Sequence, residues 1–152
     1  MSSTTNDRTN DPRSSTTHVI APVGLAPGFG YSQVAWGTGR TIAVSGQISL
    51  DERGELVGPG DPAAQARQVF ENIRRCLAEA GAGFDDVIKL TIFVTDVAHL
   101  PAIREARDAV IDTTRPPASS AVAVAALFRP EFLLEIEALA VVAEPAGTRP
   151  QG

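Results

Sequence analysis

The central stretch of the sequence reads VIKLTIFVT, at residues 87–95. Its β-branched and aromatic residues predict a strand. Apolar residues recur at helical spacing on both sides of it, through residues 62–80 and again through 100–111. Asp61 and Pro62 are suited to begin the first helix, and Gly81 is suited to end it. The sequence therefore predicts a strand between two amphipathic helices.

More strands lie outward from this unit. Short apolar runs predict them at residues 31–36, 41–48, 118–127 and 132–143. Gly37-Thr38-Gly39 separates the first two runs and predicts a hairpin, while Arg115-Pro116-Pro117 forces a break before the third. The order β-β-α-β-α-β-β indicates an α+β fold with one mixed sheet.

Both helices should cover the same face of that sheet, because crossover connections are right-handed. The twofold period of a strand then sorts the side chains between the two faces. The helix face is expected to receive Ile42, Val44, Ile48, Ile88, Leu90, Ile92, Val94, Val122, Val124, Leu134, Ile136 and Ala138. The opposite face is expected to receive Ala43, Ser45, Gln47, Lys89, Thr91, Phe93, Thr95, Ser119, Ala121, Ala123, Leu133, Glu135, Glu137, Leu139 and Val141.

The second of these faces, called the open face below, is too apolar to lie bare in water, and no helix remains to cover it. A partner subunit is the simplest cover, so we expect a homo-oligomer. Glu135 and Glu137 would then lie near an interface. A carboxylate there must be paired, hydrogen-bonded or held protonated by desolvation, and the last condition suits acid–base chemistry.

Composition excludes several classes of function. The formal net charge is -5 and there is no basic run, so we expect no nucleic acid as the main partner. Apolar runs are shorter than the roughly 20 residues of a membrane span, so we expect no membrane either. One cysteine, Cys76, excludes an internal disulfide and favours a cytoplasmic location. His18 and His99 are far apart in sequence, and no metal-ligand spacing appears.

The two ends of the chain differ from its body. Residues 1–18 and 144–152 are polar or rich in proline and glycine, and such segments bury too little apolar surface to fold. We therefore predict disordered tails around a single domain at residues 19–143.

Several motifs together resemble the YjgF/Rid family, the reactive intermediate deaminases, over about residues 20–142. They are Gly30-Tyr31-Ser32-Gln33, Val44-Ser45-Gly46-Gln47-Ile48, Ala64-Gln65-Ala66-Arg67-Gln68-Val69, Lys89-Leu90-Thr91-Ile92-Phe93-Val94-Thr95-Asp96 and Glu135-Ile136-Glu137-Ala138. The resemblance implies a chorismate-mutase-like fold and a homotrimer with clefts for a small-molecule ligand between subunits. It also implies cofactor-independent hydrolysis of enamines and imines, with release of ammonia.

The resemblance assigns roles to particular residues. Glu135 would be the catalytic group that activates water. Substrate-binding positions would be Tyr31, Ser45, Gly46, Phe93, Ser119 and Ala121. The structural alternatives are an interface carboxylate bonded to backbone amides at Glu135, a strand end with a bulge at Ser45 and a packing tyrosine at Tyr31. Glu137 is expected to be structural.

One position departs from the family pattern. An arginine normally follows Pro-Ala before the fifth strand and binds the substrate carboxylate, but here Ser119 occupies that place. A hydroxyl cannot replace two parallel charge-assisted bonds, so we expect a non-standard substrate, one that lacks the usual carboxylate. Whether a nearby cation replaces the arginine stays open, with the candidates Arg104, Arg107, Arg115 and Arg129.

The sequence is compatible with three functions. The first is a Rid-like enzyme acting on a small enamine, imine or related reactive intermediate. The second is a non-catalytic trimer of the same fold that binds a small molecule. A nuclease-like activity is the least favoured, because the chain is acidic.

Overall fold

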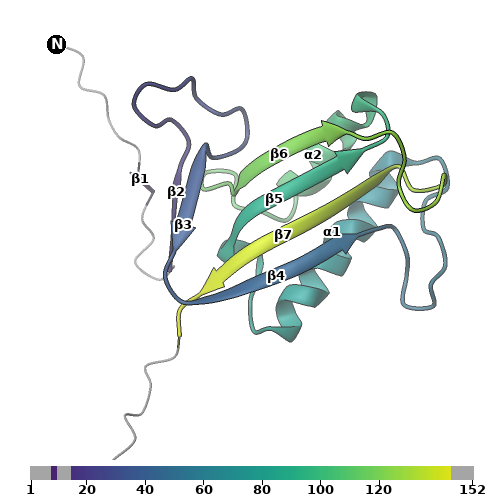
Figure 1. Ribbon diagram of the computed structural model, residues 1–152. Coiled ribbons are helices and arrows are strands. Elements are labelled where there is room, and N and C mark those ends of the chain that lie inside the picture. Colours follow the sequence, from purple (N-terminus) through teal and green to yellow (C-terminus); the bar gives the residue numbers. More distant parts are fainter. Residues whose placement is uncertain (1–7, 10–14, 145–152) are drawn as a thin grey trace, which may run out of the picture.

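Two β-sheets and two α-helices make up residues 8–9 and 15–144, the part of the chain that this computed structural model describes (Figure 1). The small sheet has the order β1 (Arg8–Thr9), β2 (Thr16–Val19), β3 (Val34–Gly37). The large sheet has the order β4 (Arg40–Gln47), β7 (Leu134–Val142), β5 (Val87–Val94), β6 (Ala118–Ala123). The helices are α1 (Pro62–Glu79) and α2 (Leu100–Asp108), with single turns η1 (Phe84–Asp86) and η2 (Val97–His99) before β5 and α2.

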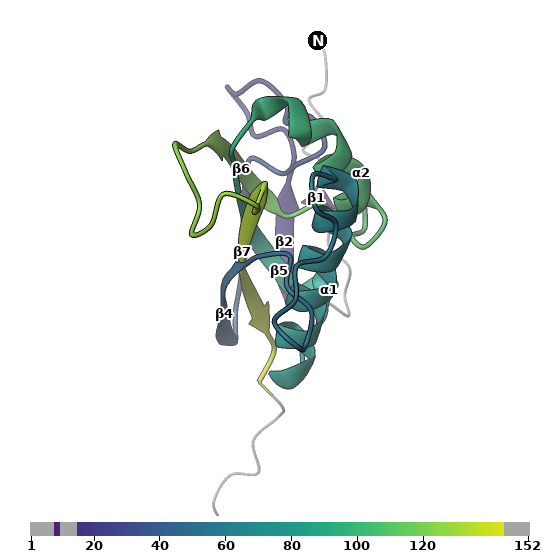
Figure 2. The same ribbon diagram turned by 90° about the vertical axis from the view of Figure 1, so that its right-hand side faces the viewer.

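The large sheet is mixed, as predicted. Strand β5 pairs in parallel with β6 and antiparallel with β7, and β7 pairs antiparallel with β4. Both helices lie on the same face of this sheet, which leaves the open face without a helix (Figure 2). The core fills the space between the layers, where Phe70, Ile73 and Leu77 of α1 and Leu90 and Ile92 of β5 are at most 2% exposed.

The predicted ends of α1 are confirmed. An Asp61 carboxylate oxygen accepts a hydrogen bond from the Ala64 amide at 3.1 Å, so the first turn of the helix is capped. Gly81 follows the last turn with φ +73°, a conformation that glycine adopts without strain. Helix α2 is shorter than predicted, ending at Asp108, and the chain continues to Ile111 in turns.

The expected hairpin at residues 37–39 is wrong. Strands β3 and β4 belong to different sheets, and β3 pairs with β2, which includes residues that we expected in the N-terminal tail. His18 is 2% exposed, with its Nδ1 2.8 Å from the Pro116 carbonyl oxygen and its Nε2 3.0 Å from Thr16 Oγ1. Polar residues can be buried when their hydrogen bonds are satisfied, and composition alone does not reveal such partners. The other residues of both expected tails, 1–7, 10–14 and 145–152, lie outside the described residues.

The predicted faces of β6 are also wrong. Ser119, Ala121 and Ala123 are register partners of Leu90, Ile92 and Val94, so all six face the helices. Val122 pairs instead with Phe93 and is 47% exposed. The strand reads ASSAVA, and alternation among residues of such similar size carries little hydrophobic signal.

A second correction lies at the start of β5. The pairing with β7 shifts between Val87 and Lys89, and this irregularity buries Val87 completely. Ile88, which we expected in the core, is half-buried. A bulge of this kind breaks the twofold period from which the prediction was made.

Candidate functional site

Glu135 lies on the open face, in register with Phe93 of the neighbouring strand. Its carboxylate packs against the backbone of Gly46 in β4. A Cβ atom at position 46 would lie 2.0 Å from Glu135 Oε1, so any other residue there would displace the carboxylate. Gly46 falls where the pairing of β4 with β7 is irregular, between Val44 and Gln47. Glu135 is half-buried in this position.

Ser45, the residue before Gly46, lines a shallow hollow of about 240 Å³ on the open face. The hollow also contains Lys89 and Glu137. The Lys89 ammonium group donates a hydrogen bond to Ser120 Oγ at 2.8 Å. The open face therefore carries both signs of charge among small and apolar side chains.

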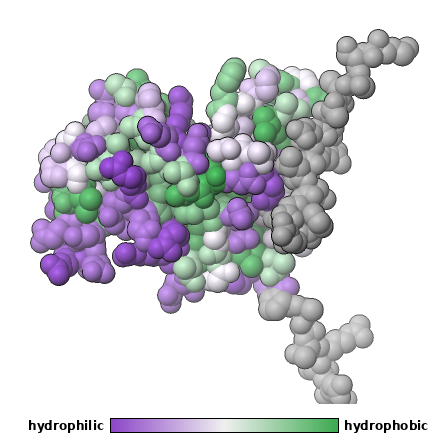
Figure 3. Space-filling view, turned by 180° about the vertical axis from the view of Figure 1, so that it is seen from behind, coloured by the Kyte–Doolittle hydropathy of each residue, from purple (hydrophilic) through white to green (hydrophobic). Residues whose placement is uncertain are grey.

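A larger pocket, of about 700 Å³, lies on the other side of the sheet, between α2, β6 and residues 29–31; we call it the α2 pocket. It is lined by Phe29, Gly30, Tyr31, Ile92, Leu100, Arg104, Arg107, Asp108, Ser119 and Ala121. Its volume is in the range of small-molecule sites. Figure 3 looks onto this side and shows a notch between the helices and the lobe that holds β2, β3 and their loop.

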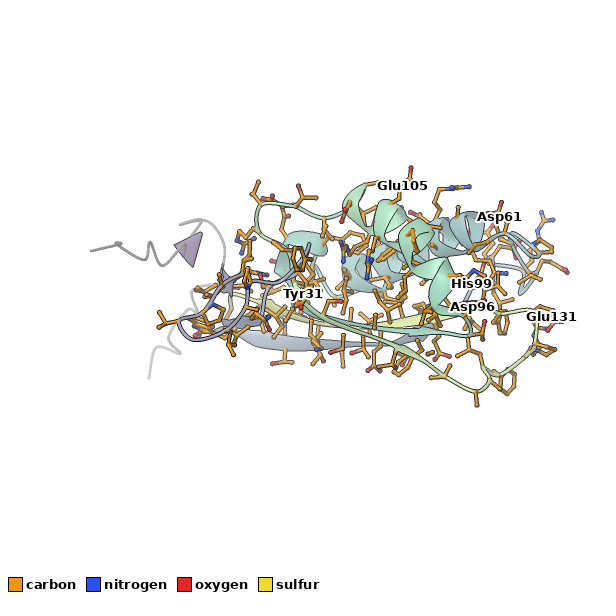
Figure 4. All side chains as sticks on the ribbon, turned by 90° about the horizontal axis from the view of Figure 1, so that it is seen from above. Tyr31, Asp61, Asp96, His99, Glu105 and Glu131 are labelled. Atoms are coloured by element: carbon orange, nitrogen blue, oxygen red, sulfur yellow. The ribbon has the colours of Figure 1, made fainter. Side chains whose placement is uncertain are left out.

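Local contacts hold Tyr31 at this pocket. The next residue, Ser32, donates its hydroxyl to the Pro116 carbonyl at 2.6 Å and its amide to the Pro117 carbonyl at 3.1 Å. It also forms a parallel bridge with Ala118, the first residue of β6. These bonds fasten the loop to the start of β6, and Figure 4 shows Tyr31 on the helix side of the sheet.

The predicted site residues fall into two groups. Ser45, Gly46, Phe93 and Glu135 belong to the open face, whereas Tyr31, Ser119 and Ala121 line the α2 pocket. Within one chain the sheet separates the two groups, so they cannot touch the same small molecule there. The site assignment remains a prediction that requires a second copy of the chain.

The four candidate arginines have different surroundings. Arg104 and Arg107 line the α2 pocket together with Ser119. Arg115 is buried elsewhere and donates to the Thr16 carbonyl at 3.1 Å. Arg129 lies 4.7 Å from the ring centre of Phe132. Helical spacing could have placed the first two on one face of α2, but not beside position 119.

Two classes of feature are absent from the described ranges 8–9 and 15–144. No group of three or more His, Cys, Asp or Glu side chains there is arranged to hold a metal ion. No helix within them has the length and apolar character needed to cross a membrane.

Comparison with known proteins identifies the family. A family model described as Endoribonuclease L-PSP matches residues 23–142. A crystal structure of the Rid-family protein YyfB from Yersinia pestis has a TM-score of 0.73 and 36% identity, covering 84% of this chain and 99% of its own. The chain belongs to the YjgF/Rid family.

Several relatives within the YjgF/Rid family carry functional names. The 3-aminoacrylate deaminase RutC of Acinetobacter baylyi is 36% identical over 124 residues, covering 82% of this chain and 97% of that protein. The 2-iminobutanoate/2-iminopropanoate deaminase of Mus musculus is 36% identical over 121 residues, covering 80% and 85%. The α+β fold expected from the motifs is thus that of a Rid protein, and deaminases of enamines and imines are among its relatives.

Proposed function

We propose that the protein is a cofactor-independent deaminase that hydrolyses a small enamine or imine. The observation that carries this proposal is the half-buried Glu135 carboxylate seated against Gly46, because it places a proton acceptor beside backbone that a small ligand can approach closely. The deaminase relatives at 36% identity support the same reaction class.

The chemistry needs one proton acceptor and one water. Glu135 takes a proton from water while the water oxygen bonds to the imine carbon. The electron pair of the C=N bond moves to nitrogen, to which the Glu135 carboxyl group returns the proton. Glu135 then takes the hydroxyl proton of the resulting carbinolamine and donates it to the departing nitrogen, so that ammonia leaves and a carbonyl group remains. An enamine enters the same sequence after protonation at carbon converts it to the imine. Ser45, on the same face, would hydrogen-bond the ligand.

A homotrimer is part of the proposal. The open face is uncovered in the single chain although it carries exposed apolar side chains such as Val122 and Leu139. In a head-to-tail arrangement, with the open face of one copy against the α2 and β6 edge of the next, the Glu135 group of one copy would lie near the α2 pocket of another. The two groups of predicted residues, Ser45 to Glu135 and Tyr31 to Ala121, would then meet at a subunit boundary.

The substrate is proposed to be bound differently from the standard imines of the family. Ser119, at the position of the usual arginine, offers one neutral hydroxyl in place of a two-pronged cationic donor. The substrate must therefore be held by other groups of the pocket.

The test is direct turnover. 2-Iminobutyrate and 2-iminopropionate are generated in place by an amino-acid oxidase, and keto acid and ammonia are followed with and without the protein. We expect accelerated release, and a loss of about 100-fold or more in Glu135→Gln, a typical effect of removing a general base. Glu137→Gln, on the same strand and face, is the matched control and should keep its activity.

Two results would contradict the proposal. Full activity in Glu135→Gln would remove that residue from the mechanism. No turnover of any imine or enamine, with a ligand still bound, would instead make the protein a non-catalytic binding member of the family.

A further inference from the structure

One side of the α2 pocket is lined by charged residues of α2. Arg104 and Arg107, one turn apart on α2, both line it, and Asp108 is the carboxylate among its described lining residues. Glu105 of the same helix points away from the sheet (Figure 4) and does not line the pocket. Two guanidinium groups against one carboxylate leave one net positive charge.

Arg107 is buried, and its guanidinium group is held in one orientation. It is 5% exposed, and its Nε and one terminal nitrogen each lie 2.9 Å from Asp108 Oδ1, which fixes the plane of the guanidinium. Its Nη2 would lie 2.9 Å from a Cβ at Gly30, where φ is +72°, so glycine is needed there both for space and for backbone conformation. A buried, oriented guanidinium interacts with an anion far more strongly than one in water.

Arg104 adds a second, more accessible cation. Its side chain is exposed, and within residues 15–144 it forms no hydrogen bond or ion pair with another side chain. Its charge is therefore available to a ligand. Ser119 and Tyr31 place two hydroxyl groups on the remaining polar wall, while Ile92 and Leu100 are apolar. Such a pocket suits a small molecule with one anionic end and one apolar end.

We propose that Arg104 and Arg107 bind the carboxylate of a small monoanionic substrate, and so replace from α2 the arginine that position 119 lacks. This inference rests on the proposed function and adds the residues that would hold the substrate. It differs from the expectation of a substrate without a carboxylate, which was based on position 119 alone. The single net charge favours a carboxylate over a phosphate dianion, which would leave negative charge unbalanced. Arg104 and Arg107 are specificity-determining residues in this proposal, and Glu135 remains the group that handles protons.

The test uses a stable ligand, so that binding is measured apart from turnover. Calorimetric titration of the full chain with 2-oxobutanoate should show binding, and the uncharged 2-oxobutanamide and inorganic phosphate should bind at least tenfold more weakly. Arg104→Met and Arg107→Met should each weaken 2-oxobutanoate binding about ten- to 100-fold, as expected for loss of a charged hydrogen bond, and leave the amide unaffected. Arg107→Lys keeps the positive charge but lacks the planar guanidinium group, so its affinity for 2-oxobutanoate should lie between those of the wild type and Arg107→Met. Arg67→Met, an exposed arginine on α1, is the matched control.

The outcomes separate this inference from the proposed function. Equal binding of acid and amide, no binding of either, or unchanged affinity in both methionine variants overturns the inference. Stronger binding of phosphate than of 2-oxobutanoate also overturns it. Arginine-dependent carboxylate binding without imine turnover overturns the deaminase proposal only. Because Arg107 is buried, circular dichroism of each variant is required, and the exposed Arg104 keeps the test decisive if Arg107→Met fails to fold.

Discussion

His18 is a histidine whose imidazole is almost wholly removed from water. Burial disfavours the charged imidazolium, and this lowers the pKa of His18 from its ordinary value. The hydrogen bond to the Pro116 carbonyl raises the pKa, the positive charge of Arg115 lowers it further, and the negative charge of Asp112, which has the smallest effect, raises it. The neutral ring is therefore the form that joins β2 to the loop before β6.

This shift predicts a pH dependence of stability. The unfolded chain binds a proton at His18 near pH 6.5, and the folded chain binds it only at lower pH. Between those values the unfolded state holds more protons, so the free energy of unfolding falls as pH drops, by at most about 1.4 kcal/mol per pH unit for one proton. The contribution is complete above pH 6.5 and lost once pH passes below the folded pKa. Urea unfolding from pH 8 to 5 should show this slope in the wild type and in His99→Gln; an equal slope in His18→Gln would refute it.

Candidate site residues can be selected from the sequence, but their faces can be predicted only in part. Motif spacing selected Glu135 and Ser119, and the expected position of Glu135 on the open face is confirmed because Leu134 and Ile136, on either side of it, are buried in the core with α1. Ser119 was placed on the wrong face because serine and alanine fit either side of an edge strand. The role of Arg107 at the pocket depends on its contact with Asp108 and on the space left by Gly30, and neither has a sequence signature.

At the scale of elements, one buried side chain of α1 joins the helix to two loops. Gln65 is fully buried, and its amide nitrogen donates to the carbonyls of Gly58 and Glu131, each at 3.0 Å. Its amide oxygen accepts from the Leu133 amide at 2.9 Å. The side chain thus satisfies backbone groups just before α1 and just before β7, which holds the strand that carries Glu135 against the helix layer.

Replacing this residue should destabilise the whole domain. Gln65→Leu keeps the size of the side chain but leaves two carbonyls and one amide without their partner, so we expect the free energy of unfolding to fall by about 3 kcal/mol. Gln68→Leu is the control on the same helix. Its strongest bond is to Asn72 at 2.9 Å, and Asn72 also donates to the Leu50 carbonyl, so the loss should stay under about 1 kcal/mol. Equal stability of the two variants in urea unfolding would contradict this reading of Gln65.

Sequence patterns predicted the long elements correctly but missed the pairing of short strands. The α1 helix has 18 residues with a cap at one end and a glycine at the other, so its period and its limits agree. Strands β2 and β3 have four residues each, too few for a period, and β2 is joined to the rest of the fold by a hydrogen bond from His18 to a residue 98 positions away. Such long-range contacts are invisible to local patterns.

At the scale of the molecule, the open face is the feature that a single chain leaves unexplained. Val122 and Leu139 are 47% and 42% exposed there, and no helix of the chain covers them. Full burial of one such side chain contributes about 2 kcal/mol. In a symmetric oligomer the same contact recurs in every subunit, so a few side chains suffice to hold the assembly.

Leu139→Arg therefore tests assembly and function together. If subunits meet on the open face, each copy would place a new guanidinium near Lys89, which is a register partner of Leu139, and the buried like charges would drive the subunits apart. Light scattering after size exclusion should give three times the chain mass of 15.9 kDa for the wild type, but one chain mass for Leu139→Arg. Val97→Arg is the control and should also give three times the chain mass, because Val97 is an apolar residue that is 60% exposed outside the sheet. Because Glu135 and the α2 pocket lie on opposite sides of the sheet, the dissociated variant should also lose imine hydrolysis while its helix content is unchanged. A Leu139→Arg protein that stays trimeric would place the interface elsewhere, and a monomer that remains fully active would show that one chain contains the whole site.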